Sequence, residues 1–193
     1  MASHRGCVAR MSVLERIRPH LERSQGDQRP VVLMTCGIAG SGKTTLAKAV
    51  VSELPQFTRL SGDEIIHEKH GLYGVDYPAD DALYQQYQEE SDAIILQRFS
   101  NLLEEGRDVV LDRSFYAKED RDEFKRLIDE RGGRWVLVFF QAADKEKLWA
   151  RIRHRSAQPK EANSALDISR ETFEMYCSGF EDPHGEGEIV VEI

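Results

Sequence analysis

The chain has 193 residues, of which 40% are hydrophobic and 31% are charged. This length fits one compact domain, with or without a terminal extension, and the apolar fraction excludes a wholly disordered chain. The net charge of −8 has the wrong sign for a protein whose main partner is a polyanion, so the composition disfavours nucleic acid as a partner.

The sequence has no pattern typical of a membrane or exported protein. No apolar run approaches the roughly 20 residues that cross a bilayer. Charged residues interrupt the first 22 positions, where a signal peptide needs an apolar segment. We therefore expect a cytoplasmic protein without a membrane partner. Cys7, Cys36 and Cys177 are widely spaced and odd in number, which favours free thiols over disulfides or a zinc site.

Strand and helix patterns alternate along the chain. The first is an amphipathic helix at 12–22, in an N-terminal extension (1–29) that we expect to pack on the surface of a domain spanning 30–193. Strands are then predicted at 31–36, 57–60, 108–111, 134–141 and 188–193, and helices at 46–54, 64–70, 80–105, 117–131, 144–155 and 168–180. Several strands are apolar throughout, which predicts an α/β fold with a parallel sheet between helices.

A phosphate-binding motif follows the first predicted strand. Gly37, Gly40, Gly42, Lys43 and Thr44 match G-x-x-x-x-G-K-[ST] in the required context, after a strand and before a helix. The glycines allow backbone N–H groups to surround an anion, the helix adds its positive dipole end, and the lysine reaches the β- and γ-phosphates. The sequence thus predicts a nucleotide site formed by Gly37, Ala39, Gly40, Ser41, Gly42, Lys43, Thr44 and Thr45, with the Thr44 hydroxyl on Mg²⁺.

Two large classes of nucleotide-binding protein lack their signatures here. GTPases need N-K-x-D to select guanine, but Asn101 and Asn163 are the only asparagines and neither precedes a lysine. Motor ATPases usually place Asp-Glu at the end of a later strand, whereas Asp112 is followed by Arg113. Asp112 can still orient Mg²⁺, directly or through water, or it can merely cap the turn after its strand.

Asp63 is the candidate for the group that handles a phosphate acceptor. It follows the second strand, at the edge of the sheet where ligands bind in α/β proteins, and it could accept the proton of an attacking hydroxyl. The alternative is that Asp63 is the N-cap of the helix at 64–70, and both roles can coexist.

These features resemble the small P-loop kinases grouped with zeta toxins and chloramphenicol phosphotransferase. The resemblance covers about residues 31–193 and rests on GIAGSGKTT, LSGDEI, VVLDRSF followed by Arg121, LWARIRHR, and FEDP. It implies a three-layer P-loop NTPase fold with a five-stranded parallel sheet in the order 2-3-1-4-5. It also implies ATP with Mg²⁺ in the loop, Asp63 as general base, and a mobile arginine lid at 151–166.

Two arginines of the predicted lid lie on one helical face. Arg151 and Arg155 are four positions apart and precede a polar loop, so both could swing over a transferred phosphate, whereas Arg153 points elsewhere. The alternative is a solvated basic face that pairs with acids such as Glu146. Arg121 has the same ambiguity.

The segment 63–105 is predicted to cover the acceptor, and its first part is acidic. Residues 63–92 include nine acids, and Lys69 is the only Lys or Arg among them. Kinases grip anionic acceptors with arginines, so this scarcity favours a neutral or cationic hydroxyl compound. Candidate substrate contacts are Asp63, Arg113, Arg121, Tyr84 and Tyr87, although the tyrosines could equally pack against helices. A phosphorylated acceptor remains an alternative, because Arg98 and Arg113 could bind its phosphate.

The sequence therefore predicts a kinase that transfers the γ-phosphate of ATP to a hydroxyl of a small metabolite. Lys43, Asp63, Arg151 and Arg155 are the predicted catalytic residues, and Arg151 is also expected to contact the nucleotide. One alternative is a nucleotide or 5'-hydroxyl polynucleotide kinase. Another is an ATP-binding regulatory module without turnover.

Overall fold

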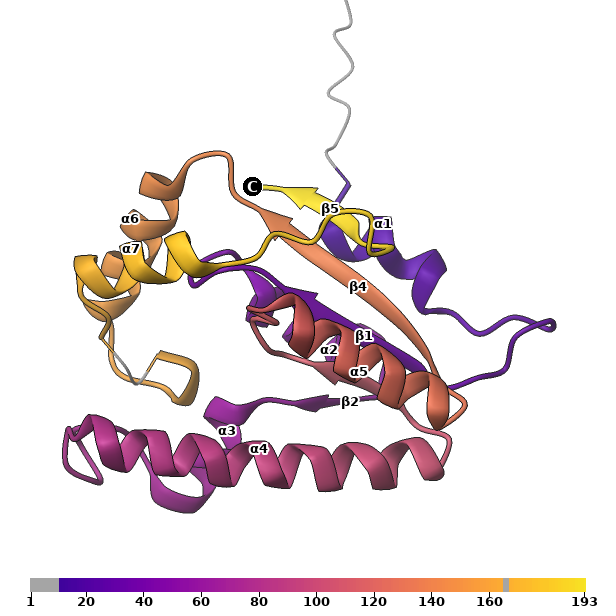
Figure 1. The fold of residues 1–193 in the computed structure, drawn as a ribbon, viewed down its shortest axis with the longest axis horizontal. Coiled ribbons are helices and arrows are strands. Elements are labelled where there is room, and N and C mark those ends of the chain that lie inside the picture. Colours follow the sequence, from indigo (N-terminus) through magenta and orange to yellow (C-terminus); the bar gives the residue numbers. More distant parts are fainter. Residues whose placement is uncertain (1–10, 165–166) are drawn as a thin grey trace, which may run out of the picture.

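The computed structural model describes residues 11–164 and 167–193. Five parallel strands form one central sheet in the order β2-β3-β1-β4-β5 (Figure 1). The strands are β1 (Val31–Cys36), β2 (Phe57–Leu60), β3 (Asp108–Leu111), β4 (Arg134–Gln141) and β5 (Ile189–Glu192). The predicted strand order is confirmed, and the first four strands begin and end at the predicted residues.

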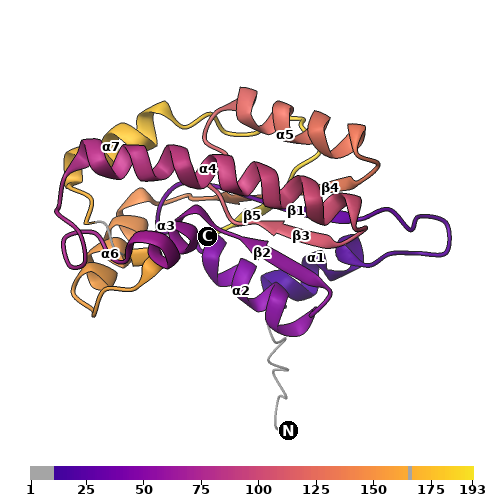
Figure 2. The same cartoon turned by 90° about the horizontal axis from the view of Figure 1, so that it is seen from below.

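Helices cover both faces of the sheet (Figure 2). One face carries α1 (Val13–Leu21) and α2 (Lys43–Glu53), and the other carries α4 (Asp81–Glu104) and α5 (Lys118–Glu130). The carboxyl ends of the strands lead toward α3 (Gly62–His70), α6 (Lys145–Ser156), the 3₁₀ turn η1 (Ala162–Ser164) and α7 (Arg170–Gly179). This three-layer arrangement is the fold of a P-loop NTPase.

Apolar side chains form a separate core layer on each face of the sheet. All six residues of β1 are buried, which explains why this strand is apolar throughout. On one face the layer contains Ile17, Leu21, Leu33, Leu46 and Val50, and on the other it contains Met34, Ile95, Phe99, Leu111 and Ile128. The two layers hold α1, α2, α4 and α5 against the sheet. A third apolar cluster holds α6 and α7 near the carboxyl edge and consists of Ile38, Leu148, Ile152 and Phe173.

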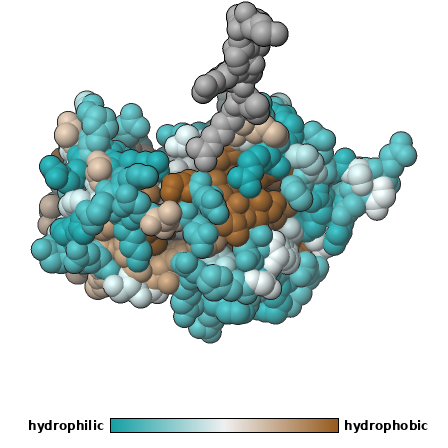
Figure 3. All heavy atoms as spheres, turned by 90° about the horizontal axis from the view of Figure 1, so that it is seen from above, coloured by the Kyte–Doolittle hydropathy of each residue, from teal (hydrophilic) through white to brown (hydrophobic). Residues whose placement is uncertain are grey.

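Helix α1 is more deeply integrated than the surface position expected for the N-terminal extension. Ser12 and Glu15 form a capping box that starts the helix. Leu14, Ile17 and Leu21 are buried in the core beneath it. Figure 3 shows an apolar area on the side where α1 and β5 lie. On these two elements and the chain end, Val13, Ile189 and Ile193 pack against this core and are only partly buried. Helix α1 therefore completes the core.

Two helices begin earlier than predicted because of their caps. Gly42 is the N-cap of α2 with a φ of 103°, a left-handed conformation that favours glycine, so this helix begins at Lys43. The N-cap of α3 is Ser61, and Asp63 lies inside the first turn. The alternative assignment of Asp63 as an N-cap is therefore wrong, which leaves its carboxylate unused by the helix end.

The structure also bears on the predictions about the cysteines and about membrane-spanning helices. Cys36 is buried and Cys177 is half-buried, and both are free thiols, while Cys7 lies outside the described residues. Within the described residues, none of the helices combines the length and apolar character that a membrane span requires.

Candidate active site

A cleft of about 1120 Å³ opens at the carboxyl ends of β1, β2 and β3. Its phosphate end is lined by residues 38–45 except Ser41, and by Asp112, Arg151 and Arg155. Its outer end is lined by Gln85, Gln88, Glu89 and Asp92 from α4, by Arg113, Ser114 and Tyr116 after β3, and by Met175 and Tyr176 from α7. Asp63 lines the same cleft. Most of the predicted site residues thus meet in one concavity.

The phosphate end is formed mainly by backbone. Gly37, Gly40 and Gly42 all have positive φ values, of 145°, 78° and 103°. A Cβ on Gly40 would lie 3.1 Å from Ile152 Cγ1 and from the Leu148 carbonyl oxygen of α6, so this position also lacks room for a side chain. Ala39, Thr44 and Thr45 line the cleft, while Gly37 and Ser41 are buried within the loop. The loop has the glycine geometry that an anion cradle needs.

Lys43 is held inside this loop. Its Nζ donates a hydrogen bond to the Ile38 carbonyl oxygen over 3.0 Å. Burial lowers the pKa of Lys43 to about 8, against the opposing effect of the Asp112 charge. A bound polyphosphate would restore the charged form, because an anion at this position stabilises the ammonium.

Thr44 and Asp112 lie together at the start of α2 and the end of β3. The Thr44 hydroxyl donates to Asp112 Oδ1 over 3.3 Å, and the Asp112 side chain is only 4% exposed. A hydroxyl and a carboxylate next to a phosphate loop are the hard oxygen donors that Mg²⁺ prefers. These two side chains therefore fit a magnesium ion shared with a nucleotide.

Asp63 lies between the two ends of the cleft. Its carboxylate is open to the cleft, yet the surrounding walls and the Asp112 charge raise its pKa above 3.8, while Arg155, Arg59 and Lys43 act in the opposite direction. Burial raises the pKa of Tyr77 and Tyr84, and the Asp63 charge acts in the same direction on both. A carboxylate with a raised pKa at such a junction is suited to accept a proton.

Both predicted lid arginines lie on the cleft. Arg151 Nη1 is 3.4 Å from the Gly40 carbonyl oxygen, a weak contact with the phosphate loop. Arg155 lines the cleft close enough to Asp63 and Lys43 to shift the pKa of each. Arg153, on the same helix, is exposed and does not line it. Glu146, the acid considered as an alternative partner, instead pairs with Arg170.

The prediction that Arg121 contacts a substrate is wrong in this structure. Its side chain is 0% exposed and makes a bidentate ion pair with Glu186, with contacts of 2.8 and 2.7 Å. It also donates over 3.0 Å to the carbonyl oxygen of Phe115, whose φ of 45° is unusual for an aromatic residue. Arg121 thus supports the loop after β3 from behind the cleft.

Tyr84 and Tyr87 also lie elsewhere than predicted. Neither lines the cleft, and Tyr87 stacks on His70 with ring centroids 3.6 Å apart. Tyr84 and Tyr87 make edge contacts with Tyr73 and Tyr77. The tyrosines join α3 to α4, while the polar residues Gln85, Gln88 and Glu89 face the cleft. Arg113 does line the cleft, where it pairs with Asp92 over 2.9 Å.

Two groups of cleft residues, and one residue behind the cleft, were not identified from the sequence. The face of α4 that packs into the core carries Ile95, Phe99 and Leu103. Toward the N-terminus of the helix, the same face carries Gln85, Gln88 and Asp92, which line the cleft. Polar residues on a core-facing stripe are a signal that could have revealed them. Met175 and Tyr176, 61% and 39% exposed, left no comparable signal. Arg59, behind Asp112, could have been noticed as a charge within a buried strand.

A match to a family model covers residues 32–183. The chain belongs to the AAA_33 family of AAA domains. No curated protein matches the chain. Solved structures with the same fold include a presumptive kinase from Chloroflexus aurantiacus, which is 20% identical, with a TM-score of 0.68 over 84% of this chain and 88% of that one.

Two further structures similar to this AAA_33 member contain nucleotides. Kti12 from Chaetomium thermophilum, in complex with ADP-AlF3, is 15% identical, with a TM-score of 0.62 over 83% of this chain and 88% of that one. The APS kinase CysC of Mycobacterium tuberculosis, in complex with AMPPNP and APS, is 18% identical, with a TM-score of 0.53 over 85% and 88%. At these identities the likeness shows the shared fold alone.

Proposed function

We propose that this protein is an ATP-dependent phosphotransferase that moves the γ-phosphoryl group onto a hydroxyl of a small neutral or cationic acceptor. The observation that carries the proposal is the separation of charge along the cleft. Cations dominate the phosphate end, where Lys43, Arg151 and Arg155 outnumber the one acid, Asp112, among the described residues that line it. Acids dominate the outer end, and Asp63 lies between the two.

The phosphate end supports ATP with Mg²⁺ as the donor. The glycine loop, Lys43 and the Thr44–Asp112 pair form the set of groups that binds a triphosphate. Two of the structural neighbours contain ADP-AlF3 and AMPPNP. Bound Mg²⁺ would neutralise the charge that develops on the β- and γ-phosphate oxygens. The absence of N-K-x-D favours adenine over guanine nucleotides.

The outer end supports an acceptor without negative charge. Among the described residues that line it, the acids are Glu89 and Asp92 and the only Lys or Arg is Arg113, which already pairs with Asp92. An incoming phosphate or carboxylate would meet Glu89 without a free cation to offset it. A hydroxyl compound that is neutral or carries an amine avoids this repulsion.

The proposed reaction joins the two ends at Asp63. The acceptor oxygen attacks the γ-phosphorus, a new O–P bond forms, and the bond from the γ-phosphorus to the β,γ-bridging oxygen breaks to release ADP. Asp63 takes the hydroxyl proton as the attack proceeds. Lys43, Arg151 and Arg155 stabilise the charge on the transferring group, and Arg155 is the arginine whose charge acts on both Asp63 and Lys43.

A nucleotide or polynucleotide acceptor is the main rival, and Arg113 is the observation that favours it. The fold also matches the Pnkp1/Rnl/Hen1 RNA repair complex with 18% identity and a TM-score of 0.53, over 80% of this chain and 47% of that one. A polynucleotide acceptor predicts single-strand binding that weakens steeply with salt. Small-molecule transfer predicts no such dependence. The narrower resemblance to zeta toxins and chloramphenicol phosphotransferase remains a prediction.

The test is a transfer assay with γ-labelled ATP and Mg²⁺ across pooled neutral, cationic and anionic hydroxyl metabolites. The proposal predicts labelled product only in pools that hold neutral or cationic acceptors, and none with Lys43→Ala. Product only from nucleotide pools would favour the rival. Nucleotide binding without transfer in any pool, including oligonucleotides, would leave the regulatory module as the better description.

A further inference from the structure

Arg59 of β2 makes the most connected side-chain cluster near the cleft. Its Nε and Nη2 donate to Asp112 Oδ2 over 3.0 and 2.6 Å. Its Nη1 pairs with Glu64, the residue after Asp63. Its Nη2 also donates to Asn163 Oδ1 over 3.0 Å. One guanidinium therefore joins four separate elements, β2, the end of β3, α3 and η1.

The position of Arg59 excludes direct contact with a substrate. Its side chain is only 7% exposed and it does not line the cleft. Two of its partners, Asp112 and Asn163, do line the cleft. Arg59 therefore contacts the lining of the cleft through Asp112 and Asn163, and its charge also acts at a distance on Asp63.

The two carboxylate oxygens of Asp112 have different partners. Arg59 holds Oδ2 from behind, and the Thr44 hydroxyl is 3.3 Å from Oδ1. Because a carboxylate can rotate about its terminal bond, fixing Oδ2 also fixes the direction of Oδ1. Oδ1 is thereby aimed at the side of the phosphate loop where Thr44 lies.

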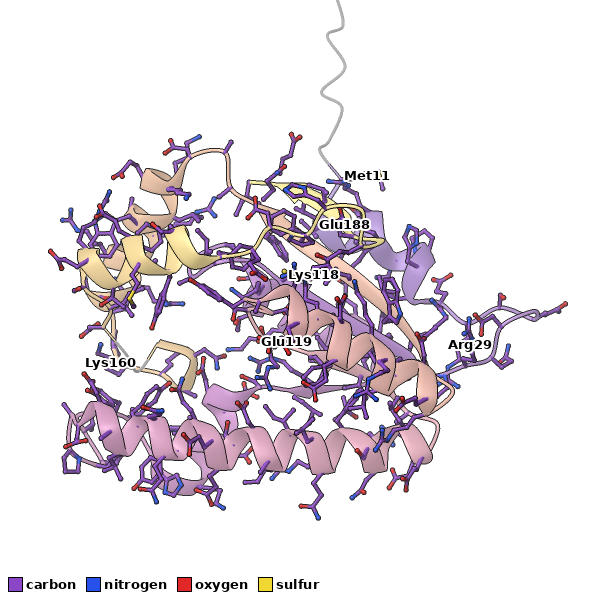
Figure 4. The ribbon with its side chains drawn as sticks, viewed as in Figure 1. Met11, Arg29, Lys118, Glu119, Lys160 and Glu188 are labelled. Carbon is purple, nitrogen blue, oxygen red and sulfur yellow. The ribbon has the colours of Figure 1, made fainter. Side chains whose placement is uncertain are left out.

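The same guanidinium reaches the segment that follows α6, which we call the lid segment (residues 157–164). Its turn η1 packs against α3, and the path from α6 toward α3 is visible in Figure 1. Lys160, labelled in Figure 4, marks this segment. The Arg59–Asn163 hydrogen bond is thus a tie between the lid segment and strand β2.

We propose that Arg59 is a positioning residue that latches the lid segment over the cleft through Asn163 while it orients Asp112 toward Thr44. The tie to Asn163 uses Nη2, which also bonds Asp112 together with Nε, while Nη1 pairs with Glu64. A lysine in its place carries its three N–H donors on a single atom, so it lacks the planar fork that reaches Asp112, Glu64 and Asn163 together. The orienting half of the proposal rests on the proposed Mg²⁺-nucleotide site, whereas the latching half does not.

The test uses two variants at the latch and one control. Arg59→Met removes the guanidinium, and Asn163→Ala removes the lid side of the tie alone. Arg134→Met removes an arginine of the same sheet that bonds to the His20 and Glu22 carbonyl oxygens, away from the cleft. Circular dichroism establishes that each variant is folded.

Two readouts separate the halves of the proposal. The first is the rate of tryptic cleavage at Lys160 without nucleotide, followed by mass spectrometry, which tracks opening of the lid segment. Loss of a hydrogen bond to a charged group should raise this rate about ten-fold in Arg59→Met and Asn163→Ala. The second is Mn²⁺ affinity in the presence of ADP, which should weaken about 10-fold or more in Arg59→Met only.

The outcomes decide the proposal even if one variant fails. Parent-like cleavage in folded Arg59→Met or Asn163→Ala overturns the latch, and parent-like Mn²⁺ affinity in Arg59→Met overturns the orienting role. Equal changes in Arg134→Met would show a general loosening of the sheet and overturn both. If Arg59→Met does not fold, the cleavage rate of Asn163→Ala decides the latch, and Mn²⁺ affinity in Arg59→Lys, expected to be weakened, decides the orientation. If no variant or parent binds ADP with Mn²⁺, the proposed function fails while the cleavage test stands.

Discussion

The two ends of the cleft differ in how the chain forms them. Most of the phosphate end is one continuous loop in which glycines with positive φ set the backbone, and Lys43 and Thr44 follow directly; Asp112, Arg151 and Arg155 are added to it from elsewhere in the chain. The outer end gathers side chains from α4, from the loop after β3 and from α7, which are far apart in sequence. A site formed by local backbone can be predicted from spacing alone, whereas a site formed by distant helices depends on how they pack.

The same distinction explains how far the sequence predicted the structure. The four strands from β1 to β4 were predicted to the residue because continuous apolar runs mark buried parallel strands. Lys43, Thr44, Asp63 and Asp112 all follow strand ends, so the parallel sheet brings them together. The catalytic and metal-binding roles of these four residues remain predictions.

The outer end was predicted less well because the rotation of α4 is set by tertiary contacts. Tyr84 and Tyr87 are one position from Gln85 and Gln88, and one position turns a helical side chain by about 100°. His70 of α3 takes Tyr87 as a stacking partner, which directs Gln88 to the cleft. Arg121 was misplaced because its partner Glu186 is 65 positions away. Such pairings leave no local pattern.

The largest expected loss of activity comes from a substitution at the phosphate end. Lys43→Ala should lower turnover by at least about 10³-fold, because the ammonium faces the transferring phosphate and its only protein hydrogen bond among the described residues is to Ile38. Thermal unfolding should change little. Lys48→Ala, on the exposed side of the same helix, is the control. Parent-like turnover in folded Lys43→Ala would remove the phosphate loop from the mechanism.

The lid arginines are the next test of the phosphate end. Arg151→Ala and Arg155→Ala should reduce turnover on the order of 10³-fold if each side chain reaches the transition state, with a smaller change in ATP affinity. Arg153→Ala should have no effect because Arg153 does not line the cleft. Steady-state kinetics and nucleotide titration measure both quantities. If all three variants behave alike, Arg151 and Arg155 form a solvated basic face.

Asp63 tests the junction between the two ends. Asp63→Asn should lose at least about 10²-fold in turnover with a hydroxyl acceptor while it keeps its affinity for ATP, since the amide cannot take the proton. The fold should be unaffected because Asp63 is not the helix cap. Glu68→Gln on the exposed side of α3 is the control. Full activity of Asp63→Asn would move the proposal to an anionic acceptor held by Arg113, because Arg98, the other candidate from the sequence, does not line the cleft and pairs with Glu68 over 3.7 Å.

The pH profile sharpens the same comparison. The raised pKa of Asp63 means that kcat/KM should fall about ten-fold per pH unit on the acid side, beginning above the ordinary range of an aspartate, because only the deprotonated base works. The lowered pKa of Lys43, about 8, should give an alkaline limb as the free enzyme loses its ammonium. Asp63→Asn should lose the acid limb only. An acid limb that persists in this variant would assign it to another group.

Arg121→Met should have the smallest effect on catalysis and a large one on stability. It leaves Glu186 buried without its main partner, which should cost about 3 to 5 kcal/mol in urea unfolding at neutral pH. The pKa of Glu186, lowered to about 2 by Arg121, means that the parent keeps this stabilisation at neutral pH and loses it as the pH falls toward 2. A raised KM with unchanged stability in Arg121→Met would contradict the structural role and favour a contact between Arg121 and the substrate.

The most direct test of the central claim is the phosphorus NMR spectrum of the product formed from ATP and an acceptor that supports turnover. The account predicts that the transferred phosphorus appears as a monoester of a carbon-bound oxygen, in an amount equal to the ADP released. A phosphoanhydride resonance, as in a newly formed nucleoside diphosphate or triphosphate, would contradict the hydroxyl acceptor. Inorganic phosphate as the only new signal would contradict group transfer altogether.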